Sequence, residues 1–228
     1  MANAPFTEPT TDYWQEILPA SEDTSAPWQY GYPARLPDSR ILKLPIRALN
    51  ANEAVASLII NQAAIDVTAQ LGAFLADAVR RFNPEVIIGL PTLGLSLAPI
   101  IAQGLGHKRY VPLGYSRKFW YTDSLSTDVS SITSPSGEKK LHLDPNQVSL
   151  VKGKRAMIID DAVSSGKTLN ASWDFLEEVG GEIVGCGVVM KQGSRWQVVL
   201  GEERAGRVCW VFECPLLRRV EGGWDVRE

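Results

Sequence analysis

The chain has 228 residues, of which 45% are hydrophobic and 21% are charged, with a formal net charge of −3. A chain of this kind buries an ordinary globular core, and the values exclude a strongly basic nucleic-acid-binding or membrane-surface protein. Its three cysteines lack metal-type spacing, which favours a reducing compartment. The sequence shows neither a secretory signal nor a membrane-spanning run. We therefore expect a cytoplasmic protein with neither nucleic acid nor membrane as partner.

Residues 1–40 are predicted to form an irregular arm that precedes a single domain at residues 41–228. The arm is rich in Pro, Thr, Ser and Asp with interspersed aromatic residues, and it lacks helical or strand periodicity. We expect its aromatic side chains to dock on the domain or on a partner subunit. A partly disordered terminus is the alternative interpretation.

Apolar strands alternate with helices along the rest of the chain. A short strand at 41–44 ends at Pro45, and one long or broken amphipathic helix is expected between 53 and 82. Further strands are predicted at 85–90, 109–113, 154–160, 182–190 and 208–212, and further helices at 96–105 and 168–179. This alternation predicts a parallel sheet covered by helices on both faces.

Residues 114–140 contain many Ser, Thr, Asp and Lys residues and show little periodicity. A non-regular stretch of this length inside a compact domain is usually an active-site lid or a disordered segment. We therefore predict a flexible lid loop here.

The strongest chemical signal lies at the end of the predicted strand at 154–160. Two acids, Asp160 and Asp161, follow the apolar run, and a loop of small and hydroxyl residues then opens a helix. The loop comprises Ser164, Ser165, Gly166, Lys167 and Thr168. Its backbone N–H groups and hydroxyls form an anion site at the carboxyl end of a strand, where open α/β sheets bind ligands. The motif suits a ligand with a phosphate at one end and a hydroxylated ring in the middle.

Two other interpretations of this motif are weaker. Helix capping explains one Asp or one Ser, but not two adjacent acids followed by a hydroxyl-glycine loop. The phosphate loop of nucleoside triphosphatases ends like Gly166-Lys167-Thr168, but it requires a glycine at the position of Asp161. A carboxylate there would repel phosphates, so we exclude this motif.

The segment from Ala156 to Thr168 resembles the phosphoribosyl pyrophosphate (PRPP) binding motif of type I phosphoribosyltransferases. The resemblance implies that Asp160 and Asp161 hold the ribose hydroxyls and that residues 164–168 hold the 5′-phosphate. It also implies the family's α/β fold, in which a central, mainly parallel sheet is flanked by helices and carries a small hood and a flexible lid.

Two further segments resemble parts of the same family. Thr92, Leu93 and Gly94 match the loop that meets the pyrophosphate and its metal. Arg117 and Lys118 match the start of the lid, where their charges would neutralise pyrophosphate while the lid excludes water. Taken alone, these segments would be interpreted as an ordinary strand-to-helix turn and a solvated loop.

The finer pattern is most similar to the bacterial xanthine phosphoribosyltransferases. In that pattern Leu42, Asn61 and Lys191 match base contacts, with Gln62 as the alternative to Asn61 because the register slips there. An ammonium group only donates hydrogen bonds, so Lys191 suits the acceptors of a 6-oxopurine better than adenine. A helix-surface amide and a solvated strand end are the alternative interpretations of Asn61 and Lys191.

The lid departs from that pattern, because Phe119 and Trp120 stand where the xanthine enzymes place further basic residues. The resemblance nevertheless implies transfer of a phosphoribosyl group from PRPP to a purine, 6-oxopurine favoured, with release of pyrophosphate. It further implies a homodimer and Mg²⁺ that Asp160 and Asp161 meet indirectly, through PRPP and water. A PRPP-sensing protein without turnover and a transferase for adenine or another acceptor are the alternatives.

Overall fold

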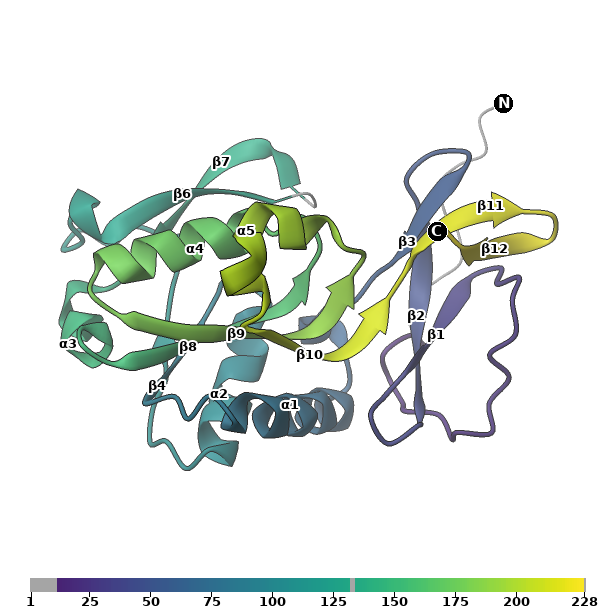
Figure 1. Ribbon diagram of the computed structural model, residues 1–228, viewed down its shortest axis with the longest axis horizontal. Helices are drawn as coiled ribbons and strands as arrows, with labels where there is room; N and C mark the ends of the chain where they lie inside the picture. Colours follow the sequence, from purple (N-terminus) through teal and green to yellow (C-terminus); the bar gives the residue numbers. More distant parts are fainter. Residues whose placement is uncertain (1–11, 132–133, 228) are drawn as a thin grey trace.

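The computed structural model describes residues 12–131 and 134–227, and its centre is a five-stranded parallel sheet of order β10-β9-β8-β4-β5 (Figure 1). Its strands are β4 (Val86–Gly89), β5 (Val111–Pro112), β8 (Arg155–Val163), β9 (Glu182–Gln192) and β10 (Val208–Cys214). All four residues of β4 are buried, as expected for a parallel strand covered on both faces.

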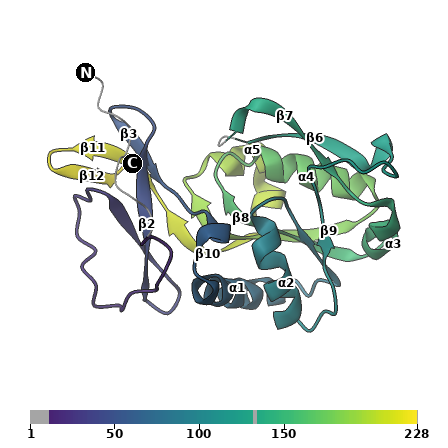
Figure 2. The ribbon, with the colours of Figure 1, turned by 180° about the vertical axis from the view of Figure 1, so that it is seen from behind.

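Helices cover both faces of this sheet (Figures 1 and 2). One face carries α1 (Ile65–Arg80) and α2 (Gly94–Gly104), and the other carries α4 (Lys167–Glu178) and α5 (Arg195–Ala205). The short α3 (Val148–Val151) precedes β8, and single 3₁₀ turns occupy Ile60–Gln62, Asp123–Leu125 and Pro145–Gln147. The buried positions of α1 recur every three to four residues and form one apolar stripe against the sheet. The predicted fold class, an α/β domain with a parallel sheet between helices, is confirmed.

A second sheet stands beyond the carboxyl ends of the central strands and forms the hood (Figure 1). Its strands are β1 (Gly31–Arg35), β2 (Ile41–Ala48), β3 (Glu53–Ala56), β11 (Leu216–Val220) and β12 (Gly223–Val226), all antiparallel and in the order β1-β2-β3-β11-β12. The hood thus joins both ends of the described chain, and the figure shows it facing the region where ligands of open α/β sheets bind.

The interpretation of residues 1–40 as an irregular arm is wrong for residues 31–35. These residues form β1, whose five positions pair with β2 from Arg35↔Ile41 to Gly31↔Pro45. The sequence pattern did not indicate this strand, because pairing with β2 stabilises it and Pro33 lowers its own strand propensity. A proline is tolerated here because β1 is an edge strand of the hood. Residues 1–11 lie outside the described part of the chain.

The single helix expected between 53 and 82 is also wrong in its first part. Residues 53–56 form β3, with Ala54 and Ala56 buried on one side. The period is therefore two rather than 3.6, but two alanines give too weak a pattern to distinguish a strand from a helix. The helix itself begins at Ile65. The strand expected at 41–44 likewise continues through Pro45 to Ala48.

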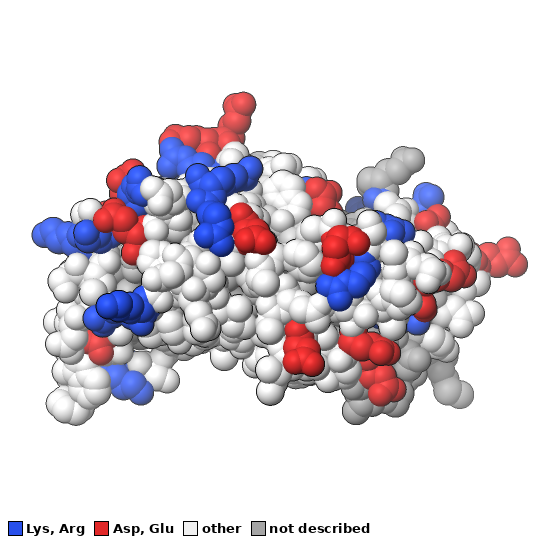
Figure 3. Space-filling view, turned by 90° about the horizontal axis from the view of Figure 1, so that it is seen from below, with Lys and Arg blue, Asp and Glu red and all other residues white. Residues whose placement is uncertain are grey.

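The stretch predicted as a lid contains a hairpin of β6 (Ser126–Ser131) and β7 (Ser134–His142), which lies along α4 (Figure 1). Ile132 and Thr133, which belong to the predicted lid, lie outside the described residues. Within the described parts, no helix is both long and apolar enough to cross a bilayer. Figure 3 shows the underside of the molecule in the orientation of Figure 1, where basic and acidic side chains are interspersed.

Candidate active site

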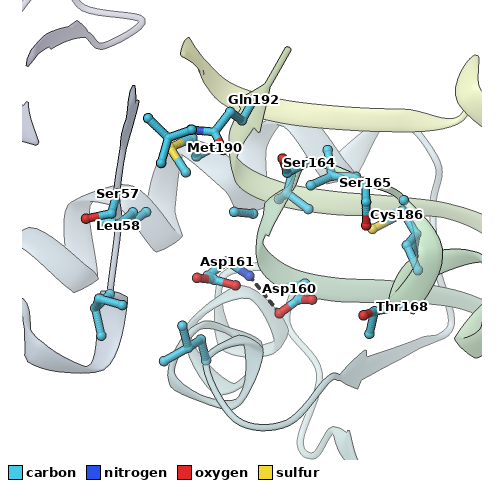
Figure 4. A pocket seen from close by; sticks show the side chains of 18 of the residues that line it. Ser57, Leu58, Asp160, Asp161, Ser164, Ser165, Thr168, Cys186, Met190 and Gln192 are labelled. Atoms are coloured by element: carbon cyan, nitrogen blue, oxygen red, sulfur yellow. Dashed lines mark hydrogen bonds between the residues drawn. The ribbon is translucent and has the colours of Figure 1, made fainter. Parts of the chain in front are cut away.

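A cavity of about 250 Å³ opens where the carboxyl ends of the central strands face the hood (Figure 4). The end of β8 and the loop after it contribute one side, and the segment after β3 together with the end of β9 contributes the other. The residues that line it include Ser57, Leu58, Leu93, Asp160, Asp161, Ser164, Ser165, Gly166, Thr168, Met190 and Gln192. The cavity therefore collects residues from segments far apart in the sequence.

The two adjacent acids lie in this cavity and are partly exposed. The backbone N–H of Asp161 donates to Oδ1 of Asp160 at 2.9 Å, and the backbone N–H of Gly94 also donates to Asp160. In Figure 4 the carboxylates point apart, that of Asp160 toward Thr168 and that of Asp161 toward the hood. The pair can therefore present charged acceptors to two sides of one ligand.

Burial raises the pKa of both carboxyl groups. The pKa of Asp161 rises to about 6, and that of Asp160 rises well above its usual range, with the negative charge of Asp161 as a second cause. The pKa of Tyr115 is also raised, by burial first and then by the charges of both acids. The charged forms of these acids would be stabilised by a ligand that brings hydrogen-bond donors or cations. Such raised pKa values are typical of ligand sites.

The loop at 164–168 forms the N-terminal end of α4. Gly166 has φ of 78°, and a Cβ on it would lie 3.0 Å from both Cα and the carbonyl oxygen of Trp196, so only glycine fits. The loop hydroxyls line the cavity, and the first N–H groups of α4 lack partners within the helix. Lys167 is exposed and does not line the cavity. The loop predicted to bind an anion therefore lines the cavity with hydroxyl groups at a helix N-terminus, and its binding of an anion stays a prediction.

The turn before α2 approaches the acids from the other side. A Cβ on Gly94 would lie 2.4 Å from the carbonyl oxygen of Ile159 and 3.0 Å from Cα of Asp160, so this turn touches β8 through backbone alone. Leu93 lines the cavity, whereas Thr92 is exposed at its side. The turn predicted to meet pyrophosphate thus packs directly against the end of β8.

The wall nearest the hood is formed by residues that the sequence analysis did not single out. Ser57 and Leu58 follow β3, and Gln192 ends β9, where its Nε2 donates to the carbonyl oxygen of Ala56 at 2.9 Å. Gln192 and Met190 share one face of β9 because side chains alternate along a strand. This alternation was the only signal in the sequence that pointed to Gln192.

Three residues predicted to contact a base do not line the cavity. Leu42 is fully buried in the apolar core, and Asn61 is exposed on its 3₁₀ turn. Lys191 lies between Met190 and Gln192, so its side chain leaves β9 on the opposite face. There its Nζ is 2.6 Å from Oε1 of Glu213 and 4.0 Å from the centre of the Trp210 ring.

The two cations of the lid also lie outside the cavity. Nη1 of Arg117 is 3.0 Å from Oδ1 of Asp123 within the lid, and Lys118 is exposed. The next residues, Phe119 and Trp120, form an edge-to-face pair with ring centres 4.8 Å apart, and Phe119 is 97% exposed. Among the described residues, no group of three or more His, Cys, Asp or Glu side chains is arranged to hold a metal ion.

Fold and site together define an α/β protein that presents two carboxylates and an anion-binding loop at the carboxyl end of a parallel sheet. A family model, described as the phosphoribosyl transferase domain, matches residues 55–213. The match covers well over half of the chain, and the chain belongs to this family.

Relatives are named for two different purine activities. The chain is 31% identical over 121 residues to a protein named xanthine phosphoribosyltransferase 1 from Clostridium perfringens, covering 50% of this chain and 60% of the relative. It is also 31% identical over 114 residues to a protein named adenine phosphoribosyltransferase from Oenococcus oeni, covering 50% and 61%. The matched segments thus span less than two thirds of either relative.

Solved structures agree with the fold. The crystal structure of adenine phosphoribosyltransferase from Rhodothermus marinus aligns with a TM-score of 0.53 at 20% identity, over 65% of this chain and 80% of that one. The structure of the adenine enzyme from Leishmania tarentolae aligns with a TM-score of 0.52 at 19% identity, over 79% and 83%. At these identities the structures support the fold alone.

Proposed function

We propose that this protein is a PRPP-dependent phosphoribosyltransferase that joins the phosphoribosyl group to a purine base and releases pyrophosphate. One observation carries the proposal: Asp160 and Asp161 lie beside the hydroxyl loop at 164–168 in a single cavity. A ligand that combines a phosphate with ribose hydroxyls uses both features at once, whereas a simple anion uses only the loop. The proposal agrees with family membership.

Each part of the site has a role in this reaction. The loop at 164–168 binds the 5′-phosphate, and the acids accept hydrogen bonds from the ribose hydroxyls. The turn at 92–94 binds the pyrophosphate. Arg117 and Lys118 reach that leaving group when the lid closes, which requires Arg117 to leave Asp123. Catalysis then consists mainly of positioning and of stabilising the charge that develops on the leaving pyrophosphate.

The donor set fits Mg²⁺ brought in with the substrate. Mg²⁺ prefers six oxygen ligands and usually keeps several waters while bound to substrate phosphates. Asp160 and Asp161 would meet the ion only indirectly, through PRPP and water, because two carboxylates are too few to hold it alone. When bound, the ion neutralises pyrophosphate charge; the acids orient it and the ribose.

Within the purines we propose a 6-oxopurine as the preferred acceptor. The support is the resemblance to the xanthine enzymes, in which Leu42, Asn61 and Lys191 match base contacts, and the xanthine-named relative. An adenine-named relative has the same identity, so adenine is the specific competitor. Lys191 would serve a 6-oxopurine only by exchanging Glu213 for the base, a change that ligand binding must drive. The resemblance further implies a homodimer, which sedimentation of the full chain tests.

A panel assay tests this proposal. Pyrophosphate release is followed with PRPP, Mg²⁺ and each of xanthine, guanine, hypoxanthine, adenine and orotate. Release with one or more purines supports the transferase, and the kcat/KM ranking decides between 6-oxopurines and adenine. If PRPP binds in a calorimeter but none of these bases releases pyrophosphate, the chain is a PRPP sensor or a transferase for an acceptor outside the panel. If PRPP does not bind at all, the interpretation of the acids and loop is wrong.

A further inference from the structure

Trp14, a residue of the N-terminal arm, contacts the wall of the cavity. This side chain is 2% exposed, although it lies in a segment with no predicted regular structure. Its indole Nε1 donates to the carbonyl oxygen of Ser57 at 3.1 Å, and Ser57 lines the cavity. The arm therefore contacts the wall of the cavity through a partly buried hydrogen bond rather than through packing alone.

Trp14 holds the same segment at its other end. The backbone N–H of Ala64, the residue before α1, donates to the carbonyl oxygen of Trp14 at 3.0 Å. Next to it, Nε2 of Gln15 donates to the carbonyl oxygen of Gln62 at 3.1 Å. Residues 57–64, which connect the cavity wall to α1, are thus bonded at both ends by two consecutive arm residues.

The backbone of Trp14 is strained in a way that fits this role. Its φ is 63°, a left-handed conformation that costs a bulky L-residue energy and persists where surrounding contacts hold it. This φ lets the ring and the carbonyl group of one residue reach opposite ends of the same segment.

A second bond fixes the wall from the side of the central sheet. Gln192 donates to the carbonyl oxygen of Ala56, the neighbour of Ser57, and the N–H of Ser57 donates to the carbonyl oxygen of Pro45 at 3.0 Å. Hydrogen bonds from three parts of the chain, at Trp14, Pro45 and Gln192, therefore converge on residues 56–57. Of these three residues, Trp14 alone lies outside both sheets.

From these contacts we infer that Trp14 is a positioning residue for the acceptor base. The wall it fixes lies on the hood side of the cavity, away from the loop at 164–168. A more mobile wall should weaken binding of the base and leave binding of PRPP unchanged. A merely structural residue would instead lower overall stability without separating the two substrates. The inference rests on the proposed function, because it assigns this wall to the base.

Kinetics of Trp14→Phe test the inference, with Trp28→Phe as the matched control. Trp28 also lies in the arm and donates its indole N–H, but to the carbonyl oxygen of Thr24 at 3.2 Å, outside the cavity. For Trp14→Phe we expect the KM of the base to rise about five- to tenfold, as for one lost partly buried hydrogen bond, with the KM of PRPP within about twofold of wild type. Trp28→Phe should change neither KM.

Hydrogen exchange of the full chain adds a readout that does not need activity. Amides in residues 57–64 should exchange faster in Trp14→Phe than in Trp28→Phe. Gln15→Ala, an exposed change that keeps the core, should raise exchange in the same segment and the KM of the base, both less than Trp14→Phe does.

The possible outcomes distinguish a failure of the positioning role of Trp14 from a failure of the proposed function. Faster exchange with an unchanged KM of the base, or equal rises in both KM values, would overturn the positioning role. If wild type transfers to no base, the proposed function fails while the exchange data still report whether the arm holds the segment. If Trp14→Phe does not fold, Gln15→Ala carries the test, and unchanged kinetics in that variant would overturn the inference.

Discussion

Replacing the two acids by amides should inactivate the protein and make it more stable. Asp160→Asn and Asp161→Asn, singly and together, keep the shape of each side chain and remove its charge. The backbone bond from Asp161 to Asp160 survives in Asp161→Asn, because the N–H is unchanged. The variants therefore test the carboxylates without disturbing the end of β8.

The size of the stability gain follows from the raised pKa of Asp161. An unfolded Asp has a pKa near 3.9 and the folded one about 6, so the folded state binds the proton more tightly. The resulting penalty is fully present above pH 6 and fades as the pH falls toward 4. Two pKa units set an upper bound of about 3 kcal/mol, and an amide removes this penalty. A gain of about 1 to 3 kcal/mol raises the Tm by about 2 to 10 °C in a chain of this length.

The assay pairs Tm at pH 8 and pH 5 with pyrophosphate release at pH 8. We expect Asp161→Asn to melt higher than wild type at pH 8, with a smaller difference at pH 5, and the double variant to lose well over tenfold in rate, at least about 1.4 kcal/mol. Asp77→Asn, an exposed change on α1, is the control and should alter neither quantity. Near-normal turnover in a well-folded double variant would refute the role of the acids. A lower Tm at pH 8 would refute the claim that their charges are destabilising.

Four further predictions concern other parts of the site. PRPP affinity should fall as the pH drops below about 6, where Asp161 takes up its proton in the empty site; calorimetry at pH 8 and pH 5.5 measures this, and a flat profile contradicts it. Gly94→Ala should lower the Tm and abolish transfer, because its Cβ would meet the carbonyl oxygen of Ile159; a wild-type melting curve would contradict this. Hydrogen exchange in residues 115–140 should slow when PRPP and Mg²⁺ are added, and unchanged protection would remove the lid hypothesis. Gln192→Ala should raise the KM of the base more than Lys191→Ala does; the reverse order would mean that Lys191 turns to the base on binding, as the family resemblance implies.

The central sheet was predictable because its signals are local. The apolar run that leads to Asp160 in β8, the glycine at 166 and the helix that begins at Lys167 follow closely along the chain, and each has its own physical reason. One β-strand and one turn therefore predict the fold class and the anion-binding end of the site. The turn at Leu93 and Gly94 was predictable in the same way, because it follows β4, the strand next to β8.

The hood was not predictable in this way because its strands are specified by partners far away in the chain. Residues 53–56 become a strand by pairing with β2 and with β11, which lies at the other end of the sequence. Their own alternation is too weak to decide between strand and helix. Lys191 lies away from the cavity for a related reason, since strand alternation places it on the face of β9 opposite to Met190 and Gln192; its contact with the base stays a prediction.

The difference between the central sheet and the hood also matters for the acceptor base, because the family match covers the two parts unequally. The family match begins at residue 55, after β1, β2 and Trp14, and ends at residue 213, before β11 and β12. It therefore includes both acids and the whole loop at 164–168, but it omits four of the five hood strands and the arm residue bonded to Ser57. The part of the chain that would bind PRPP lies inside the match. Most of the strands and the arm residue that support the cavity wall on the hood side lie outside it. The family match alone therefore carries little information about the acceptor, and we expect residues of the arm and the hood to contribute to the choice of base.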